Sequence, residues 1–382
     1  MLKFYKSNFW SLKKAMNATY HINQSYQWNY ENGPIFEGEI PKRPDIKPIK
    51  LWDYEINSPI GIPAGPLLNA NFIALYARLG FDLPVYKTVR TIERQSHPKP
   101  NCYYLKQQDR LKETDILADA ITTRDMPENI EDISITNSFG IPSKPVEIWQ
   151  ADIELANYSI DRNQLLIVSC AGTPGLKERN IIEDYALCAQ LAIEAGAKAI
   201  ELNLSCPNVV SKEGSIYQDA QLSSEITQAV KQTIGSTPLM IKIGYFKEQQ
   251  HLANILKANA PFIDGVAAIN TIPMIVRDEN GQQALPGEGR LTSGICGNVI
   301  HNLAVNMVQK IAHEKRANRY DFIICGSGGV MAQEQFNQFL DAGADLAMSA
   351  TGAMWNPYLA YQWHCAQAQE NTSVQQTHLL AD

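Results

Sequence analysis

From about residue 58 onward, short apolar runs that end in Gly, Asn, Ser or Thr alternate with stretches of helical composition. This alternation is typical of βα units that build a parallel sheet. Eight runs are predicted to form strands: Pro59–Ala64, Pro84–Val89, Leu165–Ala171, Ala197–Leu204, Leu239–Ile243, Gly265–Asn270, Phe322–Cys325 and Leu346–Ala350. Eight strands favour a closed (β/α)8 TIM barrel, an α/β fold of about 250 residues or more. A doubly wound open sheet is the alternative, but the first turn lacks its usual glycine fingerprint.

Three parts of the chain depart from this alternation. Residues 1–50 are rich in Tyr, Trp, Asn and Lys and then in Pro, so we expect an N-terminal extension ahead of a barrel domain at 51–370. Residues 371–382 are expected to form a polar C-terminal tail. The segment Arg90–Thr136, between the second and third predicted strands, is too polar for the core. We expect it to form an insertion over the C-terminal face of the barrel.

The N-terminal extension contains a candidate amphipathic helix. Apolar residues recur there at helical spacing with lysines nearby, namely Phe4, Phe9, Trp10, Leu12 and Met16 with Lys3, Lys6, Lys13 and Lys14. Such a stripe suits a membrane surface or a docking groove. A short helix packed on its own domain is the simpler explanation, and both interpretations are kept.

Composition narrows the class of protein. The 382 residues are 45% hydrophobic, which supports a large core and excludes disorder as the main state. The net charge of -7, from 33 Lys and Arg against 40 Asp and Glu, disfavours binding to a nucleic-acid backbone. No apolar run approaches the roughly 18 residues of a membrane-spanning helix, and the first residues lack the apolar region of a secretory signal. We therefore expect a soluble cytoplasmic protein.

The cysteines do not indicate a metal or a disulfide framework. The chain has seven of them, widely scattered and without a Cys-x-x-Cys pair. This pattern fits neither a zinc site nor a small disulfide scaffold, and it contains no iron–sulfur motif. No metal is expected, and most of the thiols should be buried in a reducing cytosol.

Polar residues at the ends of the predicted strands are the candidates for chemistry, because the functional groups of a barrel collect where its strands end. Lys87 and Lys242 each end an apolar run. An ammonium group there is costly to desolvate unless an anionic or electron-rich group lies against it, and a flavin or a phosphate would serve. An ion pair with a neighbouring Glu is the alternative for each lysine.

Two glycine-rich stretches indicate a phosphate-bearing cofactor. Gly326-Ser327-Gly328-Gly329 follows a predicted strand, and Ser293-Gly294-Ile295-Cys296-Gly297 precedes a helical stretch. Glycine lets the backbone approach a phosphate closely, and a helix N-terminus adds a favourable dipole. Simple tight turns are the alternative.

The segment Glu201–Asn208 carries two carboxamides and a thiol at the end of one predicted strand. Buried Asn side chains need partners, and their donor and acceptor groups match a planar imide or amide ring without adding charge. A free thiol has an unperturbed pKa of about 8.5, so Cys206 is suited to take up a proton and give it back. With Asn203, Pro207 and Asn208 beside it, we prefer this role to inert packing.

The candidate motifs occur together at the strand ends: Asn203-Leu204-Ser205-Cys206-Pro207-Asn208, Asn137-Ser138-Phe139-Gly140-Ile141-Pro142, Lys87, Lys242, Asn270-Thr271 and Ser327-Gly328-Gly329. Over about residues 58–360 the chain resembles the dihydroorotate dehydrogenase family. The resemblance implies an FMN-containing barrel that oxidises dihydroorotate to orotate in pyrimidine biosynthesis. In that family a base takes the C5 proton while a hydride leaves C6 for flavin N5.

The resemblance also implies a role for each candidate. The resemblance implies that Cys206 is the base. The soluble members of the family have a Cys at this position, whereas the membrane-bound members have a Ser. The pyrimidine is held by Lys87, Asn137, Asn203, Asn208, Asn270 and Thr271, and its carboxylate by the backbone N–H groups of Phe139, Gly140 and Ile141. The FMN is bound by Ala64, Gly65, Lys87, Thr88, Asn203, Lys242, Gly297, Ser327, Gly328, Gly329, Ala350 and Thr351.

Other functions stay open. Thr271 and the stretch 284–290 are similar to the pyrimidine-reducing barrel of dihydropyrimidine dehydrogenase, so an FMN enzyme acting on uracil or thymine is one alternative. A tRNA dihydrouridine synthase shares the flavin barrel, but the acidic charge balance and the lack of a basic tail disfavour it. A non-catalytic flavin barrel that acts as a docking protein is a third alternative.

The electron acceptor and the protein partners are not fixed by the sequence. A Cys base is typical of soluble members of the family that use fumarate or an iron–sulfur flavoprotein subunit. If the apolar N-terminal stripe instead binds a membrane or a partner protein, a quinone is the expected electron acceptor. No nicotinamide site is required. Besides the pyrimidine substrate, a homodimer and a peripheral membrane or electron-transfer partner therefore stay open.

Overall fold

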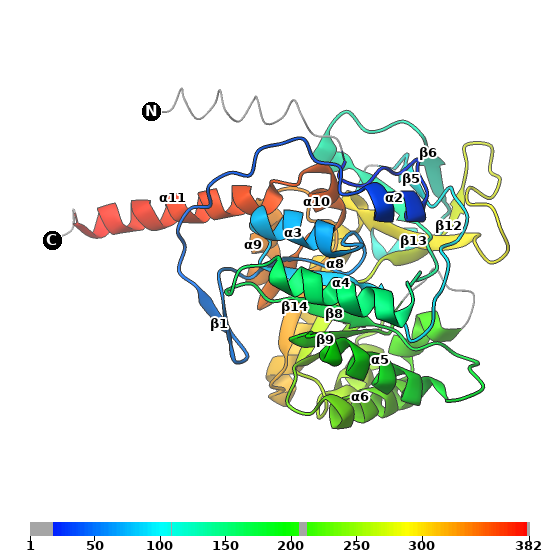
Figure 1. Cartoon of the computed structure of the whole chain (residues 1–382). Helices are drawn as coiled ribbons and strands as arrows, with labels where there is room; N and C mark the ends of the chain where they lie inside the picture. The colour runs from blue at the N-terminus through cyan, green and yellow to red at the C-terminus, as the bar shows by residue number, and fades with distance from the viewer. Residues whose placement is uncertain (1–17, 108, 206–211, 380–382) are drawn as a thin grey trace.

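The computed structural model describes residues 18–107, 109–205 and 212–379, and its centre is a closed barrel of eight parallel strands (Figure 1). Each strand pairs in parallel with the next, and the last pairs with the first through Ala347 and Ile60. In order the strands are β3 (Ile60–Ile62), β4 (Leu83–Val89), β8 (Ile167–Cys170), β9 (Ala199–Asn203), β10 (Leu239–Ile243), β11 (Gly265–Ala268), β14 (Ile323–Ser327) and β15 (Leu346–Met348). The predicted TIM-barrel fold is confirmed.

Each predicted strand coincides with one barrel strand, and the differences lie at the ends. β10 has the predicted bounds, whereas β3, β11 and β15 end two residues earlier than predicted. The backbone leaves the sheet there, because Ala64, Asn270 and Ala350 turn into loops that line a cavity. Residues expected to close these strands therefore lie just beyond them.

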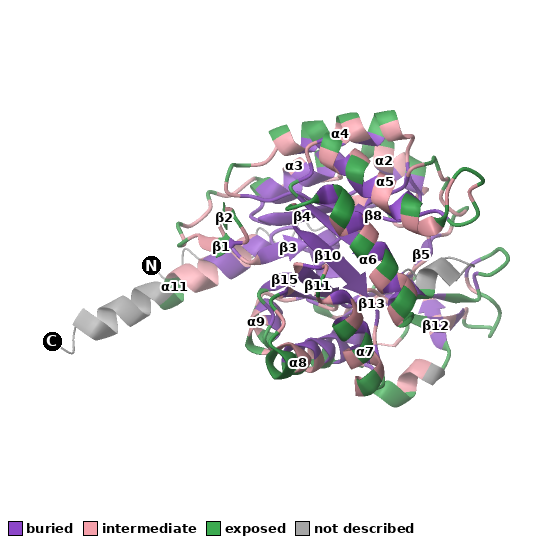
Figure 2. Ribbon diagram, turned by 90° about the horizontal axis from the view of Figure 1, so that it is seen from below, coloured by how far each residue is buried: buried purple, intermediate pink, exposed green. Residues whose placement is uncertain are grey.

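Helices cover the outside of the barrel, with buried faces turned inward and exposed faces toward solvent (Figure 2). Side-chain caps begin several of them: Asn180 accepts from the N–H groups of Ile182 and Glu183 at α5, and Asp219 caps α6. The helices are α2 (Tyr26–Asn32), α3 (Ala70–Arg78), α4 (Val146–Tyr158), α5 (Ile181–Glu194), α6 (Ala220–Ile234), α7 (Gln249–Asn259), α8 (His301–Asn318), α9 (Glu334–Asp341), α10 (Thr351–Trp355) and α11 (Leu359–Leu379). Short 3-10 helices lie at Glu113–Leu117, Ile130–Asp132, Lys212–Gln218 and Asn298–Ile300.

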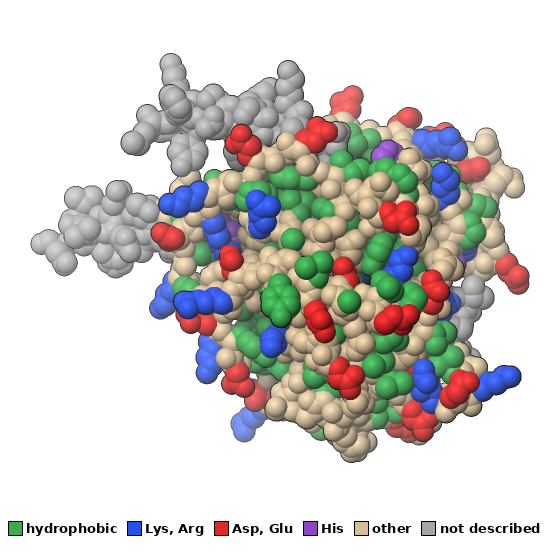
Figure 3. All heavy atoms as spheres, viewed as in Figure 1, with side chains coloured by type: hydrophobic (Ala, Val, Ile, Leu, Met, Phe, Trp, Pro, Cys, Tyr) green, Lys and Arg blue, Asp and Glu red, His purple; other side chains and the backbone are tan. Residues whose placement is uncertain are grey.

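The outer surface is mixed in charge. On the face shown in Figure 3, Lys and Arg side chains are interspersed with Asp and Glu rather than gathered in one patch. None of the helices in the described ranges is long and apolar enough to cross a membrane. The last helix, α11, runs away from the barrel and continues to Leu379, through most of the stretch predicted as a tail (Figure 1).

Apolar side chains fill the N-terminal end of the barrel. A two-stranded hairpin, β1 (Ile49–Leu51) with β2 (Tyr54–Ile56), packs on this end. Its Leu51 and Ile56 share one buried cluster with barrel residues such as Leu83, Ile167 and Met240. The interior is thus occupied at this end, and space remains at the opposite one.

A second closed sheet of five strands stands over the C-terminal end of the barrel. Its strands are β5 (Cys102–Leu105), β6 (Ala120–Thr123), β7 (Ser134–Asn137), β12 (Ile272–Arg277) and β13 (Thr292–Gly297). The segment Arg90–Thr136 supplies β5, β6 and most of β7, so the predicted insertion at this face is confirmed.

Two expectations about this sheet are wrong. The insertion is not too polar for the core, since Cys102, Leu105 and Ile135 are buried in the main hydrophobic cluster. The reason is that closure of the sheet turns alternate side chains inward. The stretch Ser293–Gly297, expected to be a phosphate-binding loop, lies in β13, which pairs with β7 and β12.

Residues 18–48 run across the barrel (Figure 1). The backbone N–H of Thr19 donates to Met354 O (2.9 Å). Arg43 forms a bidentate pair with the buried carboxylate of Asp82 (2.5 and 2.6 Å). The predicted apolar stripe of the N-terminal extension lies outside the described residues.

Candidate active site

A cavity opens at the C-terminal end of the barrel, between the strand ends and the five-stranded sheet. It contains about 1,230 Å³ of empty space, part of it open to solvent.

Every described residue that the sequence predicted for the site lines this one cavity. The set comprises Ala64, Gly65, Lys87, Thr88, Asn137, Phe139, Gly140, Ile141, Asn203, Lys242, Asn270, Thr271, Gly297, Ser327, Gly328, Gly329, Ala350 and Thr351. Cys206 and Asn208 lie outside the described residues. The structure thus brings the described candidates together, and their individual roles stay predictions.

Asn203, at the end of β9, is the centre of a hydrogen-bond network on the cavity wall. Its Nδ2 donates to Thr88 Oγ1 (3.1 Å), which lies 3.0 Å from Ser169 Oγ. Its Oδ1 accepts from Asn270 Nδ2 (3.3 Å), and Asn270 Oδ1 accepts from the N–H of Thr271 (2.9 Å). These contacts fix the orientation of both carboxamides. The buried Thr271 Oγ1, in contrast, has no partner among the described residues.

Lys242 places a nearly desolvated charge, 6% exposed, on the same wall. Its Nζ donates to Ser327 Oγ (2.7 Å), which donates to Ile269 O (3.0 Å). Glu201 on the adjacent strand is also buried there. Burial raises the pKa of its carboxyl, while the charge of Lys242 and a hydrogen bond from Ser169 oppose the rise. Lys242 therefore does have a buried Glu nearby, but the two side chains do not form the ion pair that the alternative interpretation expects.

A backbone cradle follows β14 and β15. Gly328 and Gly329 have φ values of 135° and 67°, and a Cβ on Gly329 would lie 2.7 Å from Gly297 O. Only glycine fits such a position. Within the described part of the chain, the backbone N–H groups of Gly328, Gly329 and Thr351 have no acceptor. Free N–H groups on closely packed glycines suit an anion such as a phosphate.

A second group of free N–H donors lies in the loop after β7. Gly140 and Ile141 have φ values of 79° and 52°. The N–H groups of Phe139, Gly140 and Ile141 find no acceptor among the residues that the structure describes. Successive N–H groups in such a turn form a concavity that binds anions. The cavity therefore has two groups of free N–H donors with a geometry that suits an anion, one after β7 and one after β14 and β15.

Two described thiols line the cavity, and burial raises the pKa of both. Cys296 Sγ accepts from Asn137 Nδ2 (3.3 Å), and hydrogen bonds from Thr351 and Asn137 oppose the rise in its pKa. The nearby Cys296 adds to the rise in the pKa of Cys102. Both thiols are therefore protonated at neutral pH, which makes them poor bases.

Some lining residues were not predicted from the sequence, notably Tyr20, Tyr26, Cys102, Glu201 and Met354. Tyr20 and Tyr26 pack edge-on against Phe139, with ring centroids 5.9 and 6.1 Å apart. The sequence predicts only that their segment belongs to an N-terminal extension. Nothing in its hydrophobic pattern indicates that it reaches the C-terminal end of the barrel. Glu201 did carry a signal, because a carboxylate inside an apolar strand is rare without a partner.

Comparison with known proteins identifies the family. The dihydroorotate dehydrogenase family model matches residues 124–364. The dihydroorotate dehydrogenase of Dictyostelium discoideum is 37% identical over 366 residues, which span 93% of this chain and 98% of that protein. The chain belongs to the dihydroorotate dehydrogenase family. As a member of it, the chain is an enzyme, an oxidoreductase of pyrimidine biosynthesis.

More distant similarity extends to a bacterial relative and to a solved structure. The catalytic subunit of dihydroorotate dehydrogenase B (NAD(+)) from Listeria monocytogenes is 32% identical over 181 residues, 46% of this chain and 56% of that protein. Ligand-free DHODH from Eimeria tenella superposes with a TM-score of 0.67 at 17% identity, covering 88% of this chain and 90% of that one. The structural likeness supports the fold alone. The resemblance to dihydroorotate dehydrogenases that the motifs indicate is confirmed.

Proposed function

We propose that this dihydroorotate dehydrogenase family member binds FMN and oxidises dihydroorotate to orotate, with Cys206 as the base that takes the C5 proton. The observation that carries the proposal is the convergence of all described candidate residues on one cavity. Membership of the family supports the same reaction. When bound, FMN supplies the acceptor for the hydride that leaves C6.

The cavity fits FMN in two respects. The free N–H groups of Gly328, Gly329 and Thr351 suit its phosphate. Lys242, held by Ser327, brings a fixed positive charge to the cavity, and such a charge favours an electron-rich ring. The other proposed cofactor residues on this wall are Ala64, Gly65, Lys87, Thr88, Asn203, Gly297 and Ala350.

The substrate ring is proposed to lie against the carboxamides. Asn137, Asn203 and Asn270 present donors and acceptors that match the imide edge of a pyrimidine. A ligand there gives Thr271 Oγ1 the partner that it lacks. Lys87 and Asn208 complete the proposed set. The free N–H groups of Phe139, Gly140 and Ile141 then receive the substrate carboxylate.

The assignment of Cys206 rests on its motif and on the state of the other thiols. Cys102 and Cys296 are held in the protonated form by burial, so neither suits proton abstraction. Cys206 lies three residues after Asn203 in the chain, and Asn203 is hydrogen-bonded to Asn270. Its sulfur takes the proton from C5 and later releases it to solvent.

The test uses the colour of the flavin. Purified protein should be yellow and should bleach anaerobically with dihydroorotate. Cys206→Ala should keep its flavin but be reduced about two to four orders of magnitude more slowly, the usual effect of losing a general base. Cys365→Ala, a partly exposed cysteine in α11, is the matched control. A protein that cannot be reconstituted with FMN contradicts the cofactor proposal, and an unchanged rate in Cys206→Ala assigns the proton to another group.

A neutral pyrimidine is the second candidate substrate, favoured by the similarity of Thr271 and residues 284–290 to dihydropyrimidine dehydrogenase. The free donors after β7 favour a carboxylate instead. Titration of the flavin spectrum separates the two, since uracil alone perturbs it if the second candidate is right. Steady-state assays with fumarate, a quinone analogue and NAD then identify the electron acceptor.

A further inference from the structure

Two buried arginines hold the loop after β7 from behind. Arg90 follows β4 and is 0% exposed, while Arg290 lies just before β13 and is 3% exposed. We propose that these arginines, and Arg290 above all, make the loop 138–141 an anion site and so set the preference of the enzyme for pyrimidines that carry a carboxylate. The inference rests on the proposed function and names the residue that selects its substrate class.

Arg290 is hydrogen-bonded to neutral oxygens. Its guanidinium donates to Ser138 Oγ and O (3.2 and 3.1 Å). It also donates to the carbonyls of Pro98, Pro100 and Pro286 (3.1, 2.8 and 2.7 Å). No carboxylate of the described chain forms an ion pair with it. A buried cation without a counter-charge is costly, and an anion bound nearby offsets that cost, whereas a neutral ligand does not.

The hydrogen bonds of the loop carbonyls also strengthen its N–H donors. Ser138 O accepts from Arg290 and from Asn101 Nδ2 (3.0 Å), and it belongs to the same peptide group as the N–H of Phe139. Phe139 O accepts from the N–H of His97 (3.0 Å), and it shares a peptide group with the N–H of Gly140. Hydrogen bonds in series polarise one another. Two of the three free N–H groups therefore become better donors to an anion.

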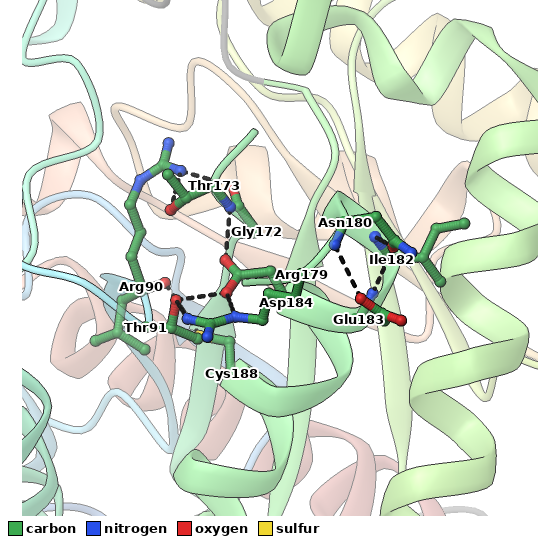
Figure 4. Close-up of polar contacts among 11 residues, drawn as sticks. Arg90, Thr91, Gly172, Thr173, Arg179, Asn180, Ile182, Glu183, Asp184 and Cys188 are labelled. Carbon is green, nitrogen blue, oxygen red and sulfur yellow. Dashed lines mark hydrogen bonds and ion pairs between the residues drawn. The ribbon is translucent and has the colours of Figure 1, made fainter. Parts of the chain in front are cut away.

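Arg90 anchors the far end of the loop. Its Nε donates to Ile141 O (3.3 Å), and its Nη1 donates to Gly172 O (2.6 Å) and Thr173 Oγ1 (3.2 Å). Figure 4 shows this guanidinium beside Thr173, whose N–H donates to the buried carboxylate of Asp184 (2.7 Å). The loop is thus tied to the connection between β8 and α5.

Asp184 extends this network further. Its carboxylate also accepts from Thr91 Oγ1 (2.6 Å) and pairs with Arg179 (Figure 4). On the other side of the loop, a Cβ on Gly140 would lie 2.6 Å from His97 Nε2. With both ends tied and its middle packed, the loop keeps its donors in one arrangement, which reduces the ordering cost of binding.

The experiment compares a charged ligand with a neutral one of the same shape. The dissociation constants of orotate and of its uncharged carboxamide are measured by titration of the flavin spectrum, in the holoenzyme and in Arg290→Gln. We expect orotate to bind roughly ten- to hundredfold more weakly in the variant, the scale of a charge-assisted contact. Carboxamide binding should change less than about twofold. Arg277→Gln, a partly exposed arginine in β12 that pairs with Asp119, is the matched control and should resemble wild type.

If the role of Arg290 is purely structural, the result is different, because Arg290→Gln then lowers the affinity for orotate and for its carboxamide by the same factor. That outcome, or unchanged affinity for both, overturns the inference. Arg290→Lys keeps the positive charge but loses the several N–H donors of the guanidinium group, so it should retain most of the preference for orotate. It serves as the main variant if Arg290→Gln does not fold. If wild type itself fails to bind orotate, the proposed function fails instead. Orotate binding that Arg290→Gln leaves intact overturns only the inference.

Discussion

The two ends of the barrel are built from the same eight strands and have opposite characters. At the N-terminal end, Leu51 and Ile56 of the β1–β2 hairpin pack on apolar strand residues in one buried cluster. At the C-terminal end, Glu201, Asn203 and Lys242 leave polar groups around open space. Burial of apolar surface stabilises the first end, while desolvated polar groups cost stability at the second. Stability and chemistry should therefore be separable by mutation.

Among the tests that compare the two ends of the barrel, the largest effect is expected from removing the buried charge of the cavity. Lys242→Met should slow reduction of the flavin by dihydroorotate about a hundred- to thousandfold, because it removes a preorganised charge from the proposed flavin site. The melting temperature should change little, since a desolvated charge contributes little to stability. Stopped-flow absorbance and thermal denaturation measure the two effects. Lys257→Met, an exposed lysine in α7, serves as control. Unfolding of Lys242→Met at ordinary temperature would contradict the separation of the two ends.

The opposite end should show the reverse pattern. Ile56→Ala removes a fully buried side chain from the apolar cluster and should lower the free energy of unfolding by about 2–5 kcal/mol. The rate of flavin reduction per bound FMN should stay near that of wild type. Denaturant unfolding measures the loss, and Glu55→Ala, an exposed residue of the same hairpin, is the control. A matching fall in the rate would show that the two ends are coupled.

A smaller, pH-dependent effect is expected near the N-terminal end. Burial, followed by the charge of Arg43, lowers the pKa of His364 from 6.5 to about 4. The unfolded chain therefore binds this proton more readily than the folded one, so the stabilisation is present above pH 6.5 and is lost as the pH falls toward 4. The difference amounts to at most about 3 kcal/mol.

The measurement is the free energy of unfolding as a function of pH. His364→Gln should flatten its slope between pH 6.5 and 4. His313→Gln, an exposed histidine in α8, should keep the wild-type slope. An unchanged slope in His364→Gln would assign the acid sensitivity to other groups.

The barrel could be predicted because its strands are buried on both faces and form continuous apolar runs. The five-stranded sheet could not. β6 alternates buried and half-buried positions over only four residues, which resembles a loop in the sequence. β13 contains Ser293, Gly294 and Gly297, so its composition predicts a phosphate loop, and only its pairing with β7 and β12 makes it a strand.

The same distinction applies to the cavity. Lys242 and Asn203 could be predicted because each is a polar residue at the end of an apolar strand. Tyr20 and Cys102 reach the cavity through segments whose position depends on tertiary packing, and their local pattern contains no sign of it. Arg290 belongs to this second group, since its contacts with Ser138 join residues far apart in the chain.

Closure of the barrel through β15 and β3 has a consequence for synthesis in the cell. Ile60 of β3 pairs with Ala347 of β15, and Thr19 donates to Met354 O. The cavity wall is therefore continuous only after these late residues have been added to the chain. A nascent chain on the ribosome therefore has no complete binding chamber until the residues up to Met354 have been translated. Products that stop before β15 lack the chamber, and capture of the proposed cofactor would report that translation has passed Met354.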